Sequence, residues 1–344
     1  MDLVDKLAQE RWLTGKEFKT LLITENENLR AKLFQTAQQV ALANFGNKIY
    51  IRGLIEFTNH CQRDCLYCGL RCSNKHLERY RLTNEAILSC CQAGYALGFR
   101  TFVLQGGEDR YYSDDVMCRL VAAMRTAFPD CAITLSLGER SFQSYKRLFE
   151  AGANRYLLRH ETADALHYSR LHPPSYSLAA RMECLYALKA IGYQVGTGFM
   201  VGSPYQLTDY FLDDLEFIKT LNPAMVGIGP FLPNKDTPFR HQKPGSLEDT
   251  IRLLAILRLM LPKALIPATT ALATLHPMGR QYGILAGANV VMPNLSPLEA
   301  REKYTLYDGI VHTGAEAAES LKLLNSQLNS FGYELTVDRG DYQG

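Results

Sequence analysis

Three cysteine side chains are concentrated on one short segment, CQRDCLYC, at Cys61, Cys65 and Cys68. The segment comes directly after a strand-like run, IYIRGLIEFTN. Thiolates bind zinc and iron-sulfur clusters, so three of them on one loop indicate a metal site. A 4Fe-4S cluster held by only three thiolates would leave one iron open to the amino and carboxylate groups of S-adenosylmethionine. Reduction of that cluster would then cleave the sulfonium bond and release a 5'-deoxyadenosyl radical.

Two other uses of the cysteines remain open from the spacing alone. Zinc would need a fourth ligand, from Cys72 or His60, because closed structural zinc sites have four protein ligands. A disulfide framework is less favoured, since the nine cysteines are odd in number and no apolar run resembling a secretory signal follows Met1. We therefore expect a reducing compartment, the cytoplasm, in which the thiols are available to a metal.

The overall composition argues against two classes of partner. With 37 basic and 35 acidic residues the formal charge is +2, and no basic block or basic-aromatic pattern indicates a nucleic-acid surface. No apolar run approaches the roughly 20 residues that span a bilayer. We expect a soluble protein that binds neither nucleic acid nor membrane. The 344 residues suffice for one α/β barrel or for two smaller domains, and no low-complexity linker marks a boundary.

The order of the expected elements favours one barrel. Apolar residues at helical spacing predict an N-terminal helical preface over residues 1–45. From residue 49, short β-rich runs alternate with longer amphipathic runs, the pattern of parallel strands joined by crossover helices. The expected strands lie near 49–58, 101–105, 131–137, 154–159, 194–201, 224–229, 265–270 and 289–292. Eight strands close a (β/α)8 TIM-type barrel, an α/β fold, here expected over residues 46–344 with a helical tail at its carboxyl end.

Polar residues and glycines stand at the ends of several expected strands. In such a barrel the carboxyl ends of the strands share one face, where catalytic groups gather, and the cysteine loop follows the first strand. Other strands end in QGGED (105–109), SLGE (136–139), RHET (159–162) and PATT (267–270). Glycines let a ligand approach the backbone, and charges at buried strand ends are costly unless paired or ligand-bound. These ends therefore predict a partly polar pocket.

The spacing CxxxCxxC, with the aromatic Tyr67 directly before the third cysteine, resembles the radical S-adenosylmethionine superfamily. Further segments, in order between about residues 47 and 310, are similar to the HydE family of FeFe-hydrogenase maturation. They are IRGLIEFTN, CLYCGLR, RYRLT, VLQGGED, LSLGER, RYLLRHETA, MVGIGPF, PATTALATL and GANVVMPNLSP. Biotin synthase and methylornithine synthase are near relatives of this family that share the cluster loop and the barrel.

The resemblance implies a role for each matching residue. Cys61, Cys65 and Cys68 would hold one 4Fe-4S cluster. The positions that would bind S-adenosylmethionine are Tyr67, Gln105, Gly106, Gly107, Ser136, Glu161, Arg181, Met292 and Tyr304. The positions that would bind a carboxylate-bearing, sulfur-containing substrate deep in the barrel are Arg52, Thr134, Arg159, Thr269, Thr270 and Tyr307.

The reaction that the resemblance implies is attack of a 5'-deoxyadenosyl radical on the sulfur of a cysteine-derived iron carbonyl cyanide complex. That attack would be a step towards the diiron subcluster of the hydrogenase. Implied partners are the companion maturases HydG and HydF and a one-electron donor such as ferredoxin or flavodoxin. One alternative keeps the radical chemistry with another substrate, as in methylornithine synthase or biotin synthase. Another is an assembly protein that binds a metal cluster and passes on a metal fragment without catalysis.

The chain departs from the family pattern near its carboxyl end. Many family members carry three further cysteines there for a second cluster. Here no cysteine follows Cys184, and His312 stands about where the first of them would fall. We therefore expect no second cluster. Gly106 also replaces a serine that is common in the family. The sequence does not indicate whether Cys72 or His312 binds a metal.

Overall fold

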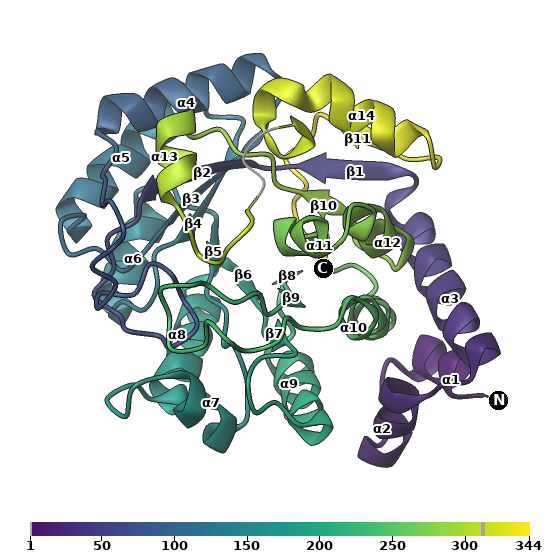
Figure 1. The fold of residues 1–344 in the computed structure, drawn as a ribbon. Helices are drawn as coiled ribbons and strands as arrows, with labels where there is room; N and C mark the ends of the chain where they lie inside the picture. Colours follow the sequence, from purple (N-terminus) through teal and green to yellow (C-terminus); the bar gives the residue numbers. More distant parts are fainter. Residues whose placement is uncertain (1, 311–313) are drawn as a thin grey trace.

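The computed structural model describes residues 2–310 and 314–344, and its centre is a ring of parallel strands enclosed by helices (Figure 1). His312 lies outside the described residues. The strands are β1 (Lys48–Ile51), β2 (Gly53–Thr58), β3 (Thr101–Gly106), β4 (Ala132–Ser136), β5 (Arg155–Leu157), β6 (Gln194–Thr197), β7 (Met200–Val201), β8 (Met225–Val226), β9 (Gly229–Pro230), β10 (Val290–Val291) and β11 (Glu334–Thr336).

Eight strand positions close this ring. One parallel sheet runs in the order β2-β3-β4-β5-β6-β8. Single bridges continue it from Met225 to Leu265 and from Pro267 to Val290, and Val290 pairs with Tyr50 of β1. The predicted (β/α)8 barrel is therefore confirmed.

Four of the eight expected strands, the first, fifth, sixth and seventh, are divided or reduced to bridges in the structure. The first expected strand divides at Arg52, because β1 pairs with β10 and β11 whereas β2 pairs with β3. The fifth and sixth divide into β6 with β7 and β8 with β9. The seventh, expected over 265–270, is reduced to bridges at Leu265 and Pro267. Proline has no N–H to donate to a ladder, and a helix already begins at Thr270.

Helices cover the outside of the barrel. Six of those that follow the first strands begin with a side chain that accepts a hydrogen bond from a backbone N–H of the first turn, which stabilises a helix start. These caps are Thr83, Ser113, Ser141, Asp164, Ser177 and Ser246. The helices after the first strands are α4 (Asn84–Ala96), α5 (Asp114–Ala127), α6 (Phe142–Glu150), α7 (Ala165–Leu171), α8 (Leu178–Ile191), α9 (Thr208–Leu221), α10 (Leu247–Met260), α11 (Thr270–Leu275), α12 (Gly279–Leu285) and α13 (Leu298–Lys303).

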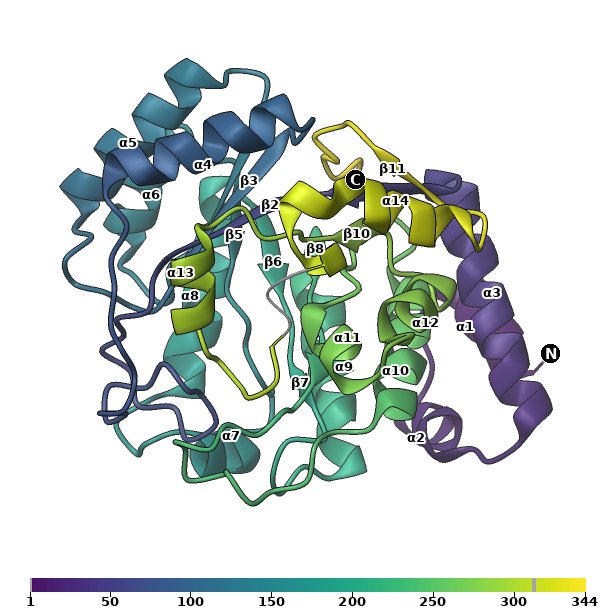
Figure 2. The same ribbon diagram turned by 45° about the horizontal axis from the view of Figure 1, so that its top comes forward.

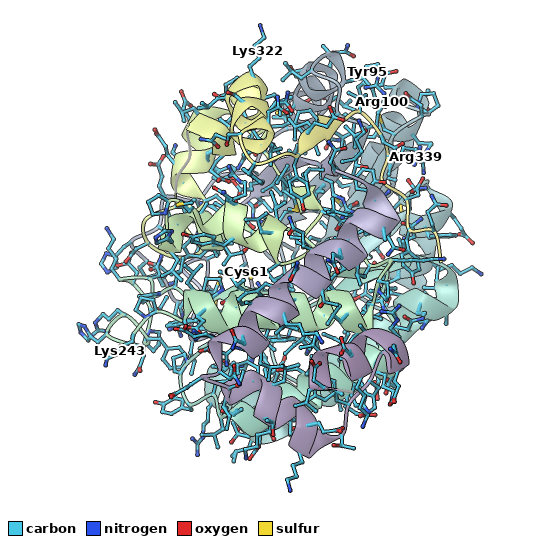
Figure 3. The ribbon with its side chains drawn as sticks, turned by 90° about the vertical axis from the view of Figure 1, so that its right-hand side faces the viewer. Cys61, Tyr95, Arg100, Lys243, Lys322 and Arg339 are labelled. Atoms are coloured by element: carbon cyan, nitrogen blue, oxygen red, sulfur yellow. The ribbon has the colours of Figure 1, made fainter. Side chains whose placement is uncertain are left out.

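Three helices precede the barrel: α1 (Leu3–Glu10), α2 (Gly15–Ile23) and α3 (Glu27–Phe45). Figure 3 shows them, in purple, lying across one side of the molecule. Val4, Phe18 and Leu33 are buried in the same apolar cluster as Leu257 of α10. The preface thus packs on the barrel wall, and its status as a separate domain stays a prediction.

The carboxyl-terminal segment closes the opposite end of the barrel from the cysteine loop. After α14 (Leu321–Asn329), strand β11 pairs in parallel with β1, the first strand of the ring (Figure 1). Figure 2 shows β11 beside α14. Arg155, fully buried at the start of β5, donates to the Asp341 carboxylate at 2.7 Å and to the carbonyl oxygens of Arg339 and Gly340. The expected tail is therefore helical only in part.

Across residues 2–310 and 314–344, no helix has both the length and the apolar character that crossing a bilayer requires.

Candidate active site

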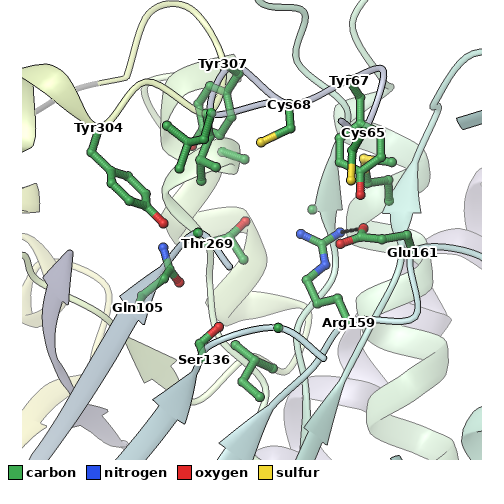
Figure 4. A pocket seen from close by; sticks show the side chains of 18 of the residues that line it. Cys65, Tyr67, Cys68, Gln105, Ser136, Arg159, Glu161, Thr269, Tyr304 and Tyr307 are labelled. Atoms are coloured by element: carbon green, nitrogen blue, oxygen red, sulfur yellow. Dashed lines mark ion pairs between the residues drawn. The ribbon is translucent and has the colours of Figure 1, made fainter. Parts of the chain in front are cut away.

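A cavity of about 390 Å³ opens at the carboxyl ends of the strands, within the size range of small-molecule sites. Most of the site residues predicted from the sequence line this cavity (Figure 4). Those that line it are Cys61, Cys65, Tyr67, Cys68, Gln105, Gly106, Gly107, Ser136, Arg159, Glu161, Arg181, Thr269, Thr270, Met292, Tyr304 and Tyr307. Because these side chains come from strands far apart in the sequence, the barrel itself assembles the site.

Two predicted site residues, Arg52 and Thr134, do not line the cavity. Arg52 is buried two residues before Leu54, which does line it, and its Nη1 lies 2.7 Å from the sulfur of Met225. Burial, together with the charge of Arg155, lowers the pKa of Arg52. The hydroxyl of Thr134 is buried without a hydrogen-bond partner, two residues before Ser136. Both lie deeper in the barrel than the cavity wall, and their role in substrate binding stays a prediction.

The cysteine loop rests on the glycine turn that follows β3. The Sγ of Cys61 accepts backbone N–H groups of Arg63 and Glu108, each at 3.4 Å. A Cβ atom on Gly107 would lie 2.2 Å from the carbonyl oxygen of His60 and 2.6 Å from the Cβ of Cys61. Only glycine fits at that distance, so Gly107 determines how closely the loop approaches the strand end.

Charged side chains fix the loop from the other side. Arg63, inside the loop, pairs with Glu108 at 2.6 Å and with Glu139 at 2.5 Å. Arg181, on α8, pairs with Glu139 at 2.8 Å. The network links the loop to the ends of β3 and β4. The sequence motifs indicated no role for Arg63, Glu108 or Glu139, although the last two belong to the QGGED and SLGE motifs.

Glu161 adopts an unusual backbone conformation at the cavity wall. Its φ of 68° lies in the left-handed region, which costs a non-glycine residue roughly 1–2 kcal/mol. Its N–H donates to the carbonyl of Gly198, and its own carbonyl accepts from Met200. The carboxylate Oε2 lies 3.1 Å from Arg159 Nη2, without hydrogen-bond geometry. The backbone therefore presents a poorly satisfied carboxylate to the cavity.

Burial changes the protonation of several cavity groups. It raises the pKa of Cys65 to about 12 and also raises that of Cys68. It raises the pKa of Glu56 to about 8, against a hydrogen bond from Asn294 at 2.7 Å. Burial lowers the pKa of His172 to about 3, so the ring that contacts the Tyr67 hydroxyl at 3.2 Å is neutral.

The three thiols suit a polynuclear cluster better than a single ion. All three line the cavity, and the side chains of Cys65 and Cys68 extend into it from the loop (Figure 4). Among residues 2–310 and 314–344, no three His, Cys, Asp or Glu side chains converge on a point that could hold one metal ion. An iron-sulfur cluster instead takes one thiolate on each iron, so its ligands need not converge. Cys72 is exposed, and all nine cysteines are free thiols.

Sequence comparison identifies the family. The Radical SAM superfamily model matches residues 55–218. Over 308 residues the chain is 42% identical to the FeFe hydrogenase maturase subunit HydE of Thermotoga maritima, covering 90% of this chain and 87% of that protein. The chain belongs to the radical SAM superfamily, in the HydE family. The predicted cofactors, a 4Fe-4S cluster and S-adenosylmethionine, are those of the superfamily, and the catalytic interpretation is preferred to the non-catalytic one.

Other radical SAM enzymes share its fold. The crystal structure of methylornithine synthase superposes with a TM-score of 0.86 at 29% identity and covers 97% of both chains. The 3-methylornithine synthase of Methanosarcina acetivorans is 31% identical over 305 residues, covering 87% of this chain and 85% of its own. A HydG structure shares the fold at a TM-score of 0.81 and 20% identity, covering 97% of this chain and 75% of its own.

Proposed function

We propose that this HydE-family enzyme directs a 5'-deoxyadenosyl radical onto the sulfur of a cysteine-derived iron carbonyl cyanide complex. The reaction would be a step in building the diiron subcluster of FeFe-hydrogenase. The 42% identity to a HydE over 90% of the chain supports the pathway. The observation that carries the substrate class is a set of unsatisfied polar groups in the cavity wall.

Those groups suit a carboxylate. The Nε of Arg159 and the hydroxyl of Thr269 are buried without hydrogen-bond partners, and both residues line the cavity. Buried polar groups in native proteins are nearly always satisfied, so unpaired ones in a cavity indicate a ligand. A guanidinium binds a carboxylate through two parallel hydrogen bonds. The cysteine moiety of the proposed substrate would supply that carboxylate.

Each part of the cavity has a separate task. Cys61, Cys65 and Cys68 would hold the cluster, which when reduced supplies the electron that cleaves S-adenosylmethionine. Glu161, which faces the cavity, would accept a hydroxyl or ammonium hydrogen of the cosubstrate. Arg159 would hold the substrate below it, so that the reacting carbon and sulfur meet with little freedom of movement.

The partners belong to the same proposal. HydG and HydF would act before and after this enzyme, and ferredoxin or flavodoxin would supply single electrons in the cytoplasm. The family relationship supports the maturase context, and the individual partners follow from the proposed reaction.

The test compares two substrates under anaerobic conditions. Reconstituted enzyme receives a reductant, S-adenosylmethionine and either the iron carbonyl cyanide complex of cysteine or lysine. The proposal predicts that the iron complex accelerates 5'-deoxyadenosyl transfer. Its sulfur gains a bond to the adenosyl carbon while the bond from sulfur to iron breaks and leaves one electron on the iron. An Arg159→Gln variant should raise the concentration of complex needed, while substrate-free cleavage of S-adenosylmethionine continues.

A second candidate, methylornithine synthesis, is favoured by the structural match to methylornithine synthase, with a TM-score of 0.86. Turnover of lysine with rearrangement of its carbon skeleton, and no acceleration by the iron complex, would establish it in place of the first.

A further inference from the structure

Two loops beside the cysteine loop carry four exposed cations: Lys75, Lys235, Arg240 and Lys243. We propose that these four residues, the basic rim, are a docking surface for an acidic protein that delivers single electrons. The proposal deepens the proposed function and rests on it, because it concerns the reduction of the same site.

The cations of the basic rim are not used inside the protein. Across residues 2–310 and 314–344, none of the four forms an ion pair, whereas other surface cations such as Lys19 and Lys32 do. The Nε of Arg240 donates to the neighbouring His241 ring at 3.1 Å rather than to a carboxylate. The acids beside these loops are too few to offset four cations: Asp236 is half-buried in the same depression, Glu78 is already paired with Lys303, and the exposed Asp308 accepts the backbone N–H of Lys235 at 2.8 Å. The rim therefore presents net positive charge to solvent.

The basic rim lies against the segment that carries the third thiol. A Cβ atom on Gly69, the residue after Cys68, would lie 2.4 Å from the Nδ2 of Asn234. Asn234 directly precedes Lys235, and consecutive Cα atoms are about 3.8 Å apart. From the other side, Asn74, the residue before Lys75, donates to the carbonyl of Gly69 at 2.8 Å.

The two loops also share a surface. Residues of both line one depression at the protein surface, including Lys75 and Lys235. Figure 3 shows Lys243 extending from one edge of the molecule, well separated from Lys322 on α14. A protein seated in this depression would approach Cys68 through one layer of backbone.

The chemistry of the site determines the kind of occupant. A cluster on the cysteine loop must receive one electron per turnover, and the loop is enclosed on its inner side by the barrel. An acidic surface around the redox group of the donor would complement four free cations and speed encounter, by about 10-fold to 1,000-fold at low salt. An uncharged or basic donor would gain nothing from them.

The test separates docking from chemistry. Lys75→Glu/Lys235→Glu is compared with a control of equal charge change, Lys263→Glu/Lys322→Glu, whose lysines are exposed and unpaired on the opposite end of the barrel and on α14. The reduction rate of the reconstituted cluster is followed by its visible absorption, with reduced flavodoxin and separately with dithionite. This readout needs no substrate, so failure of the proposed substrate leaves the docking test intact.

We expect the rim variant to need at least about tenfold more flavodoxin than the parent at low salt. The difference in flavodoxin concentration between the rim variant and the parent should shrink at about 0.5 M salt, where surface charges are screened. Reduction by dithionite and the control variant should be unchanged. If dithionite reduction also falls, Arg240→Glu/Lys243→Glu repeats the test further from the cysteine loop. The proposal would be overturned if the rim variant, or this outer variant, needed the same flavodoxin concentration as the parent for half-maximal reduction.

Discussion

Gly107 and Cys61 are in such close contact that a single methyl group cannot be placed between them. The Cβ of Cys61 would be 2.6 Å from a Cβ on residue 107, where real Cβ contacts are longer than 3.0 Å. The turn after β3 thus determines the position of the first cysteine, and through it the position of the whole loop.

Substitution of Gly107 by alanine should therefore move the cysteine loop. A displacement of about 1 Å at reacting groups costs about 100-fold in rate, and we expect that loss in 5'-deoxyadenosine formation. The matched control is Gly15→Ala at the start of α2, where a Cβ meets nothing closer than 3.6 Å. Iron content, melting temperature and 5'-deoxyadenosine are measured for both. Equal activity of the two variants would refute a positioning role.

Arg63 should stabilise the loop through its two carboxylate partners. The side chain of Glu108 is only 7% exposed, so removal of Arg63 leaves a buried carboxylate whose remaining cation, Arg181, lies 4.0 Å away. We expect Arg63→Gln to lower the free energy of unfolding by about 3 kcal/mol. Arg147→Gln breaks a pair with Asp115 whose side chains are 49% and 67% exposed, and should cost less than about 1 kcal/mol. Denaturant titrations measure the free energy of unfolding of both variants. Equal losses would show that Arg63 does not stabilise the loop through its buried partner.

Glu56 should make stability depend on pH. Burial raises its pKa in the folded protein from the ordinary 4.5 to about 8, so the fold favours the protonated carboxyl. That contribution is complete below the unfolded pKa and is lost as the pH rises through about 8. Glu56→Gln keeps an acceptor for Asn294 without the charge. We expect the parent to lose a few kcal/mol more than the variant between about pH 5 and pH 8. Parallel curves of unfolding free energy against pH would show that Glu56 ionises normally.

The barrel could be predicted because its signals are local. Alternating β-rich and amphipathic runs predicted most strands to within a few residues. Strand β11 was missed, since the three residues ELT carry no pattern and their partner Lys48 is 286 positions away. The seventh strand was predicted over 265–270, but only Leu265 and Pro267 form bridges. The apolar residues before Pro267 resemble a strand, although proline has no N–H to donate to a ladder.

The candidate site shows the same division. Motifs at strand ends nominated most of the cavity residues, because parallel strands bring their carboxyl ends together. The sequence did not show how far each residue lies from the cavity. Thr134 and Ser136 are two positions apart on β4, yet of these two only Ser136 lines the cavity. The pairs of Arg63 were also missed, since Glu108 and Glu139 are 45 and 76 residues away and each carboxylate had several possible cations.

We expect the three cysteines of the loop to hold a cluster with an iron open to S-adenosylmethionine. The most direct measurement is the electron paramagnetic resonance spectrum of the anaerobically reconstituted, reduced protein, with and without S-adenosylmethionine. Cys68→Ser is the test variant, and Cys72→Ser, at an exposed position four residues on, is the control.

We predict a reduced 4Fe-4S signal that changes when S-adenosylmethionine is added, in the parent and in Cys72→Ser. The signal and the brown colour should be lost in Cys68→Ser. The open iron would be refuted if the cluster signal did not change with S-adenosylmethionine. The ligand assignment would be wrong if the signal survived in Cys68→Ser and disappeared in Cys72→Ser.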